Sequence, residues 1–370
     1  MELMNDGTTI ERQMFAKAAE KRLPLYGVLE LLPLCNLNCD MCYVRMSKQE
    51  MEQVGRLRTI SEWLSIAEDM AKAGTLFILL TGGEPLLYPE FRTLYLKLLE
   101  LGMIVTINTN GTLLNKEWAD FFAEHKPRRI NITLYGASNK TYEQLCHYPN
   151  GFDKTVEGIR LLRERDIDVK INGSLAKGNV DDRMQIIEIG ESLDAPVRID
   201  TYMYPTIRER LHDYNYQSRL NPETAARARV DVLRREMGEE LFSQYRKMTL
   251  ETVQQTQEGE AIPGRMKCRA GQSSFVINWQ GQMRSCVVLD NPSISLDETP
   301  FADAWEQVVM GVEKLRISVK CNQCTLRNVC NTCAAAAIAE TGRADGVPEY
   351  LCRYTKATIQ YLEESFAKKD

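Results

Sequence analysis

A chain of 370 residues in which 44% are hydrophobic and 26% are charged can bury a substantial core, which excludes an intrinsically disordered protein. The net charge of -5 and the lack of a long lysine or arginine block argue against a nucleic-acid partner. No apolar run reaches the roughly 18 residues of a membrane span, and residues 1–13 lack the apolar centre of a signal peptide. We therefore expect a cytoplasmic protein with no membrane partner.

Short apolar runs alternate with amphipathic helical segments between residues 25 and 203, which predicts strands that are joined by helices and paired in parallel. The six predicted strands are Tyr26 to Leu32, Leu76 to Thr81, Ile104 to Asn108, Ile130 to Leu134, Val169 to Leu175 and Val197 to Tyr202. One helix is expected to begin after Thr59 or Ser61, and another to end at Gly102. The predicted fold is α/β, a partial (β/α)6 TIM-like barrel; an open sheet stays an alternative because periodicity does not separate the two.

Polar residues gather on one side of four of these strands, while the other side is mainly Ile, Val and Leu. The polar set is Thr106, Asn108, Asn131, Thr133, Tyr135, Lys170, Asn172, Ser174, Arg198, Asp200 and Tyr202. The apolar side suits packing under helices, so we expect the polar side to line a wet cavity inside the barrel. The alternative is that some of these side chains simply pair with one another.

The chain divides by composition into four predicted parts. Residues 1–24 form an N-terminal helical segment and 25–204 the barrel. Residues 205–265 are charged and favour helices, as in Asn221 to Met237 and Glu239 to Gln257, and predict a helical bridge. Residues 266–370 are rich in turns and cysteines, and predict a small second domain. Its Phe275 to Trp279 and Met283 to Leu289 are expected to form a hairpin.

Eleven cysteines are unevenly placed along the chain, which points to metal. Cys35, Cys39 and Cys42 directly follow the first predicted strand, at the end where barrels carry their chemistry. Three thiolates can hold three irons of a cubane cluster and leave the fourth iron open. A zinc site is the alternative, but three cysteines leave its tetrahedral shell incomplete. A disulfide framework does not suit a long chain in a reducing compartment.

The spacing Cys35-x-x-x-Cys39-x-x-Cys42, followed by Thr81-Gly82-Gly83-Glu84-Pro85 at the next strand end, resembles the signature of radical S-adenosylmethionine (SAM) enzymes. The resemblance implies that the three cysteines bind the catalytic [4Fe-4S] cluster, which an electron donor of the flavodoxin or ferredoxin type reduces. It implies that the backbone of Gly82, Gly83, Glu84 and Pro85 meets the methionyl amino group of SAM. The same resemblance assigns further cofactor contacts to Met41, Asn108, Thr133 and Asn172.

The C-terminal cysteines resemble the SPASM extension of radical SAM enzymes, which carries two auxiliary [4Fe-4S] clusters. The resemblance assigns the first auxiliary cluster to Cys268, Cys286 and Cys333, and the second to Cys321, Cys324, Cys330 and Cys352. Together with the catalytic cluster, this implies three clusters. The last pair is spaced x-x where the common pattern is x-x-x, which weakens the assignment of Cys333. Zinc in a four-thiolate site is again the alternative.

Two further positions bear on these assignments. Some relatives have an eighth cysteine where this chain has Ser273 and Ser274, so the first auxiliary cluster is expected to have an open iron. Cys146, on a predicted helix, is expected to be an ordinary buried thiol far from both cysteine sets.

The function implied by the resemblance is a radical reaction on a peptide, with a cross-link such as a thioether formed in a ribosomally made precursor. Only 34 residues precede Cys35, so recognition of a leader peptide is expected to need a separate protein or the helical bridge. Asp200 and Tyr202, which are polar and at a strand end, are the candidate catalytic side chains. The alternative for Asp200 is an ion pair with Arg198.

Three other functions stay open from the sequence. A sulfatase maturase that forms formylglycine needs an acidic residue soon after the hairpin cysteine, and here Asp290 comes only fourth after Cys286. Oxidation or epimerisation of a small molecule, such as an amino sugar or a tetrapyrrole, is compatible with a polar barrel. A non-catalytic iron-sulfur electron carrier has no use for Gly82 to Pro85 or for a polar cavity.

Overall fold

The computed structural model describes residues 9–205, 218–256 and 268–367. Its centre is a run of parallel strands in which each strand pairs with the next one along the chain. The strands are β1 (Tyr26–Glu30), β2 (Phe77–Thr81), β3 (Ile104–Thr109), β4 (Arg129–Thr133), β5 (Val169–Ser174) and β6 (Val197–Asp200). The predicted six-stranded partial barrel is therefore confirmed.

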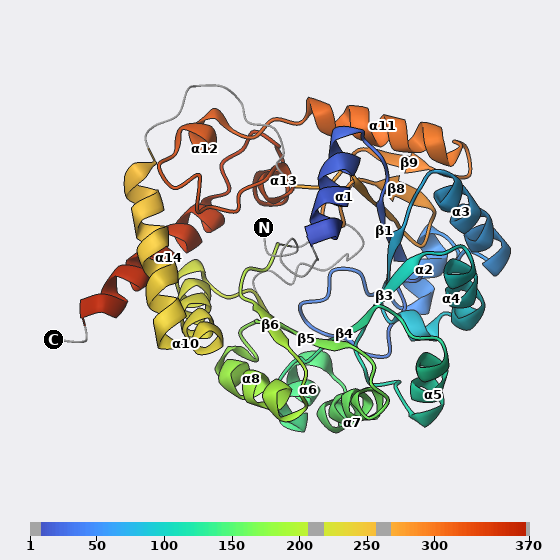
Figure 1. The fold of residues 1–370 in the computed structure, drawn as a ribbon, viewed down its shortest axis with the longest axis horizontal. Coiled ribbons are helices and arrows are strands. Elements are labelled where there is room, and N and C mark those ends of the chain that lie inside the picture. Colours follow the sequence, from blue (N-terminus) through green and yellow to red (C-terminus); the bar gives the residue numbers. More distant parts are fainter. Residues whose placement is uncertain (1–8, 206–217, 257–267, 368–370) are drawn as a thin grey trace.

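Helices that connect the strands lie around the outer side of this curved sheet (Figure 1). They are α2 (Lys48–Val54), α3 (Ile60–Lys72), α4 (Phe91–Glu100), α5 (Lys116–Glu124), α6 (Asn139–Cys146), α7 (Gly151–Arg163) and α8 (Arg183–Ser192), with the short 3-10 turns η2 (Pro85–Leu87) and η3 (Val180–Asp182). Thr59 caps α3, because its side chain accepts the amide of Glu62 while the Glu62 carboxylate accepts the amide of Thr59. Of the two caps that the sequence offered, Thr59 is the one used.

The predicted hairpin is present, and it extends the barrel sheet. It consists of β7 (Ser274–Ile277) and β8 (Gln282–Arg284), followed by β9 (Ser293–Ser295). β7 pairs in parallel with β1, so the sheet has nine strands in the order β6-β5-β4-β3-β2-β1-β7-β8-β9. This pairing covers the edge of β1, which would otherwise expose unpaired backbone groups. The sequence did not indicate it, because pairing between distant strands leaves no local pattern.

The remaining helices come before β1 or after β6 in the chain. They are α1 (Thr9–Glu20), α10 (Pro222–Gln255), α11 (Phe301–Lys314), α12 (Val319–Gln323), α13 (Ala334–Thr341) and α14 (Glu349–Ala367). α10 lies against α14 (Figure 1) and begins after the cap Asn221. Gly238 breaks it with a φ of 71°, at the boundary between the two predicted helices. Residues 206–217 and 257–267 of the predicted bridge lie outside the described residues, and the domain boundaries stay a prediction.

Burial along β3, β4 and β5 alternates as the sequence predicted. Ile107, Ile132 and Ile171 are fully buried in the main core. The residues that alternate with these isoleucines along each strand, such as Asn108 and Asn131, are only half-buried. The side-chain amide of Asn131 donates to Asn108 Oδ1 at 2.8 Å. Some of the polar side chains thus pair with each other while remaining accessible. Within the described parts of the chain, no helix combines the length and the apolar character needed to cross a membrane.

Candidate active site

The loop after β1 carries Cys35, Cys39 and Cys42. Cys39 is buried and the other two are half-buried. Burial raises the pKa of Cys35 to about 12, and the nearby charges of Glu84, Cys39 and Cys42 act in the same direction. The backbone amide of Leu37 opposes this shift because it stabilises the Cys35 thiolate. The three thiols therefore lie close enough to influence one another. A metal that binds them must displace their protons.

Backbone amides point at two of these sulfur atoms. The amide of Leu37 lies 3.4 Å from Cys35 Sγ, and the amide of Arg45 lies 3.2 Å from Cys42 Sγ. Such N–H donors stabilise thiolate ligands and the clusters that they bind. The local loop geometry thus suits negatively charged sulfur at both positions.

The loop after β2, which contains Gly82 and Gly83, lies directly against the cysteine loop. The amide of Gly83 donates to Leu32 O at 2.7 Å, and the amide of Glu84 donates to Leu34 O at 2.9 Å. A Cβ atom at Gly83 would lie 2.2 Å from Leu34 O, and one at Gly82, whose φ is +143°, would lie 2.5 Å from Leu32 O. The glycines thus allow two backbone segments to meet, in addition to any role toward a ligand.

Glu84 holds the loops after β2 and β3 together with its side chain. Its carboxylate accepts hydrogen bonds from the amide of Leu86 at 3.1 Å, the hydroxyl of Thr109 at 2.8 Å and the amide of Asn110 at 2.8 Å. The side chain is completely buried. Burial raises the pKa of Glu84 to about 7, against the opposing effect of these three hydrogen bonds. The Glu84 side chain is therefore occupied within the protein.

Asn110 is a site residue that was not predicted from the sequence, where only Asn108 was assigned a cofactor contact at this strand end. The Asn110 amide donates to Asn36 Oδ1 at 3.0 Å and lies 3.6 Å from Cys35 Sγ. Its oxygen accepts the hydroxyl of Thr112 at 2.6 Å, and Asn36 donates back to that hydroxyl at 2.8 Å. This closed ring of bonds fixes the cysteine loop to the end of β3.

The other candidate cofactor residues are placed on neighbouring elements. Thr133 and Asn172 are directly opposite each other on β4 and β5, and both are half-buried. Pro85 begins η2 and is buried. Met41, within the cysteine loop, is 7% exposed and packs in the main core. Their contacts with a cofactor stay predictions.

The two candidate catalytic residues have different surroundings. Asp200 is half-exposed and forms an ion pair with Arg198 at 3.1 Å, which is the alternative considered from the sequence. The hydroxyl of Tyr202 is buried and has no hydrogen-bond partner among the described residues. Burial raises the pKa of Tyr202, so it keeps its proton at neutral pH. A catalytic role for either residue stays a prediction.

The C-terminal cysteines form two groups in space. Burial raises the pKa of Cys286 to about 11, with smaller contributions from Cys268 and Cys333, which places these three thiols together. Burial likewise raises the pKa of Cys352 to about 11, with contributions from the second group. That second group contains Cys330, Cys321 and Cys324 besides Cys352. Cys333 also contributes to the raised pKa of Cys330, so it lies near both groups, and the assignment of the cysteines to two clusters stays a prediction.

Cys146 corrects one expectation. It is fully buried, as predicted, but it is not far from the first cysteine set, Cys35, Cys39 and Cys42. The amide of Asn38 donates to Cys146 O and the amide of Asp40 donates to Leu145 O, both at 3.0 Å. A hydrogen bond with Cys146, followed by burial, raises the pKa of Cys39 well above its usual range. The sequence could not show this, because the contact joins segments more than 100 residues apart.

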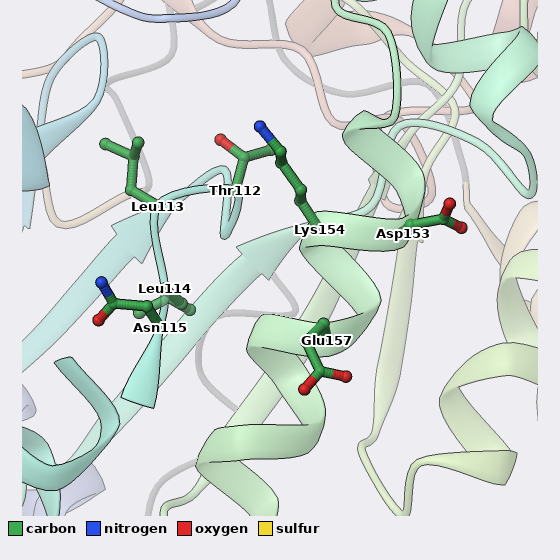
Figure 2. Close-up of a pocket in the computed structure, with 7 residues that line it drawn as sticks. All are labelled: Thr112, Leu113, Leu114, Asn115, Asp153, Lys154 and Glu157. Carbon is green, nitrogen blue, oxygen red and sulfur yellow. The ribbon is translucent and has the colours of Figure 1, made fainter. Parts of the chain in front are cut away.

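A separate pocket of about 440 Å³ lies beside this region, between the loop after β3 and α7 (Figure 2). It is lined by Thr112, Leu113, Leu114, Asn115, Asp153, Lys154 and Glu157. None of these is a cysteine or a barrel-strand residue. Thr112, through its bonds to Asn110 and Asn36, is the connection between the pocket and the cysteine loop.

All eleven cysteines lie among the described residues, and none forms a disulfide. Within the same part of the chain, no three Cys, His, Asp or Glu side chains are preassembled around a single-ion position. A cubane cluster takes one thiolate per iron, so its ligands surround a larger object than one ion. The three-cysteine loop, with amides directed at Cys35 and Cys42, fits such a cluster better than it fits zinc.

Comparison with known proteins gives a family match to the radical SAM superfamily over residues 29–189. The chain is 27% identical to the AdoMet-dependent heme synthase of Methanosarcina barkeri over 85% of this chain and 92% of that protein. It is 25% identical to the PqqA peptide cyclase of Bradyrhizobium diazoefficiens over 47% of this chain and 45% of that protein.

Two solved structures share the fold over 93% of the chain. Streptococcus suis SuiB, bound to the precursor peptide SuiA, has a TM-score of 0.65 at 17% identity, with 80% of SuiB covered. The enzyme anSMEcpe, bound to AdoMet and the Kp18Cys peptide, has a TM-score of 0.67 at 18% identity, with 98% of it covered. At such low identity this likeness shows the fold alone. It extends beyond the barrel into the cysteine-rich C-terminal part.

Proposed function

The chain is a radical SAM enzyme, and we propose from this premise that Cys35, Cys39 and Cys42 bind its [4Fe-4S] cluster and that its radical acts on a peptide. When bound, the reduced cluster supplies one electron that splits SAM into methionine and a 5'-deoxyadenosyl radical. The nearness of the three thiols and the amides directed at Cys35 and Cys42 support this ligand set.

Residues around the cysteine loop are proposed to hold SAM. The backbone after β2, from Gly82 to Pro85, lies against the cysteine loop and can meet the amino group of the cofactor. Thr133 and Asn172 face each other across β4 and β5, which suits contacts with the ribose and the carboxylate. Asn108 and Met41 are proposed to complete the site. Glu84 is proposed to act through its backbone, since its carboxylate is occupied by Thr109 and Asn110.

The observation that carries the peptide proposal is the presence of seven further cysteines in the C-terminal part, where Cys286 lies near Cys268 and Cys333 and where Cys352 lies near Cys330, Cys321 and Cys324. We propose two auxiliary clusters there, the first with an iron that has no protein thiolate. Thioether formation joins a C–H carbon to a thiol sulfur and removes two hydrogen atoms. One would leave as a hydrogen atom to the deoxyadenosyl radical and the other as a thiol proton to solvent, and an auxiliary cluster held by these cysteines would supply the acceptor for the remaining electron.

Relatives support a peptide substrate. PqqA peptide cyclase is named for a peptide substrate, and SkfB is named for the maturation of a sporulation killing factor. SuiB and anSMEcpe, which share the fold over nearly the whole chain, were solved with bound peptides. A flavodoxin or ferredoxin is proposed as the electron donor. A separate leader-binding protein, or the region around α10, is proposed to recognise the peptide.

The test begins with the oxygen-free, reconstituted chain. We expect about twelve irons per chain, and a loss of about four irons together with SAM cleavage in Cys35→Ala/Cys39→Ala/Cys42→Ala. A cysteine-containing precursor peptide encoded beside this gene should then lose the mass of two hydrogen atoms, with one deoxyadenosine formed per cross-link. A fully loaded enzyme that forms no deoxyadenosine contradicts the ligand assignment, and cleavage of SAM without change in the peptide contradicts the substrate.

A second candidate is a tetrapyrrole substrate. It is favoured by the similarity to a heme synthase, which spans 85% of this chain, whereas the peptide cyclase match spans 47%. The same preparation is incubated with iron coproporphyrin III, and the product is followed by absorption and mass. A porphyrin-dependent rise in deoxyadenosine and a new porphyrin mass would replace the peptide proposal with this one.

A further inference from the structure

Arg45 follows the third cysteine of the loop after β1 and lies where that loop closes on itself. The amide of Arg45 lies 3.2 Å from Cys42 Sγ, and the amide of the next residue, Met46, donates to Pro33 O at 3.0 Å. The side chain of Arg45 is half-buried, and its Nε atom is buried without a hydrogen-bond partner among the described residues. A positively charged side chain therefore begins directly beside a proposed cluster ligand.

Arg45 differs from the six other arginines whose Nε atom is buried. Five of those pair with a carboxylate and the sixth lies over an aromatic ring; they are Arg58, Arg163, Arg183, Arg219 and Arg234, with Arg269 over Phe15. In the part of the chain that the structure describes, the Arg45 guanidinium has no ion pair, hydrogen bond or ring contact. Moving a charge away from water without pairing it is unfavourable, so an anion that binds at Arg45 removes a cost.

Arg45 lies on the side of β1 that adjoins the C-terminal hairpin. The residues on either side of Pro33 accept amides from the loop after β2, whereas Pro33 itself accepts the amide of Met46. Met46 belongs to one buried cluster with Trp279, which follows β7. β1 pairs with β2 on one edge and with β7 on the other. Arg45 is therefore placed between the cysteine loop and the hairpin that leads to Cys286, across from the loop where SAM is proposed to bind.

We propose that Arg45 binds a carboxylate of the substrate and so selects an acidic molecule. A substrate that meets the radical and passes an electron to an auxiliary cluster has to lie between the cysteine loop and the C-terminal part, which is where Arg45 lies. A planar guanidinium can form two parallel hydrogen bonds with a carboxylate. In a peptide the carboxylate is an aspartate, a glutamate or the C-terminus, and in a porphyrin it is an acidic side chain. This inference rests on the proposed function and deepens it.

The first measurement needs no substrate. Arg163→Met is the matched control for Arg45→Met, because the Arg163 Nε is also buried while its guanidinium donates to Asp194 at 2.5 Å, at the other end of the barrel. In urea unfolding of the iron-free chain, Arg45→Met should keep or raise the midpoint, whereas Arg163→Met should lower it. Iron content and equilibrium SAM binding of reconstituted Arg45→Met should equal those of the wild type. A midpoint lowered as much as in Arg163→Met overturns the proposal, as does weaker SAM binding, which would make SAM the source of the carboxylate.

The second measurement is the kinetics of the whole reconstituted chain with the precursor peptide or iron coproporphyrin III, whichever raises deoxyadenosine formation. Arg45→Met should raise KM by about tenfold or more with little change in kcat, and Arg45→Lys should recover part of the loss. Amides in the peptide, or methyl esters on the porphyrin, should raise the KM of the wild type similarly but leave that of Arg45→Met unchanged.

Equal KM values for the wild type and Arg45→Met overturn the proposal, as does an equal response of the two enzymes to the neutral substrate. The molecule whose neutral form loses affinity identifies the source of the carboxylate. If neither molecule raises deoxyadenosine formation by the wild type, the proposed function fails and this inference falls with it. Failure of this inference alone is seen only in the comparison of Arg45→Met with an active wild type.

Discussion

The Glu84 carboxylate accepts the backbone amide of Asn110 at 2.8 Å, and this bond joins the loop after β2 to the loop after β3. Glu84 is the acidic residue of the Gly-Gly-Glu-Pro segment. Its side chain is fully buried, and burial raises its pKa to about 7 from the usual 4.5. A buried carboxyl group whose charged form is disfavoured is thus part of the framework beneath the proposed cofactor site.

The first prediction concerns pH. Because the folded-state pKa of Glu84 is above its unfolded-state value, its contribution to stability is fully present below about pH 4.5 and is lost as pH rises through about 7. The loss amounts to about 3 kcal/mol. Glu84→Gln cannot ionise, so its free energy of unfolding should rise relative to that of the wild type as pH rises.

Urea unfolding of the iron-free wild type and Glu84→Gln between about pH 5 and about pH 8 measures this difference. The glutamine amide will meet donors such as Thr109, which adds a constant cost. The slope of the difference with pH is therefore the readout. A difference that does not change with pH would show that Glu84 is ionised in the folded protein throughout this range.

The second prediction concerns Gly83. A Cβ at this position would lie 2.2 Å from Leu34 O, so Gly83→Ala must separate the two loops. We expect a loss of about 2 to 3 kcal/mol in stability, and a loss of SAM cleavage because Leu34 adjoins Cys35. Gly102→Ala is the control: its φ is +77° but nothing lies within 4 Å of the added atom. The control should cost about 1 kcal/mol and retain SAM cleavage.

The strands and several helix ends were predictable because they depend on local sequence. The apolar runs mark β1 to β6, Thr59 and Glu62 form a capping box, and Gly238 divides α10 where the two predicted helices met. The polar parity of β3 to β5 gave the accessible side of the barrel. Local patterns fix such features because their partners are a few residues away.

The parts that were not predicted depend on contacts between distant segments. The pairing of β7 with β1, the bonds from Glu84 to the β3 loop and the contact of Cys146 with Cys39 are of this kind. Each was open to several readings from the sequence, since a glutamate in a loop or a cysteine on a helix has no periodicity. These contacts become evident only in the folded structure, where the loops lie side by side.

The third prediction tests the ring of bonds around Asn110. Asn110→Ala removes the donor to Asn36 and the acceptor of Thr112, and should cost about 1 to 3 kcal/mol. It should also lower the iron retained at the catalytic site, because the Asn110 amide lies 3.6 Å from Cys35 Sγ. Asn115→Ala, which removes the cap of α5, is the control: it should lose about 1 kcal/mol with normal iron content. Equal iron contents in the two variants would show that Asn110 does not help to retain the catalytic cluster.

The fourth prediction concerns how the C-terminal part is attached to the chain before α10. Arg219 forms an ion pair with Glu340 of α13 at 2.5 Å, and their side chains are 3% and 11% exposed. The Arg219 guanidinium also lies 3.5 Å above the ring of Tyr350 in α14. Removing one charge leaves the other buried without its partner, which costs far more than losing an exposed pair.

Arg219→Met should therefore lower the free energy of unfolding by about 3 to 5 kcal/mol, and adding Glu340→Leu should recover a large part of it. The exposed pair between Arg235 and Glu191 is the control, with an expected loss of less than about 1 kcal/mol for Arg235→Met. A double-mutant cycle in urea measures both pairs. Additive losses at Arg219 and Glu340 would mean that the stacking of Arg219 on Tyr350, and not the ion pair, attaches this part of the chain.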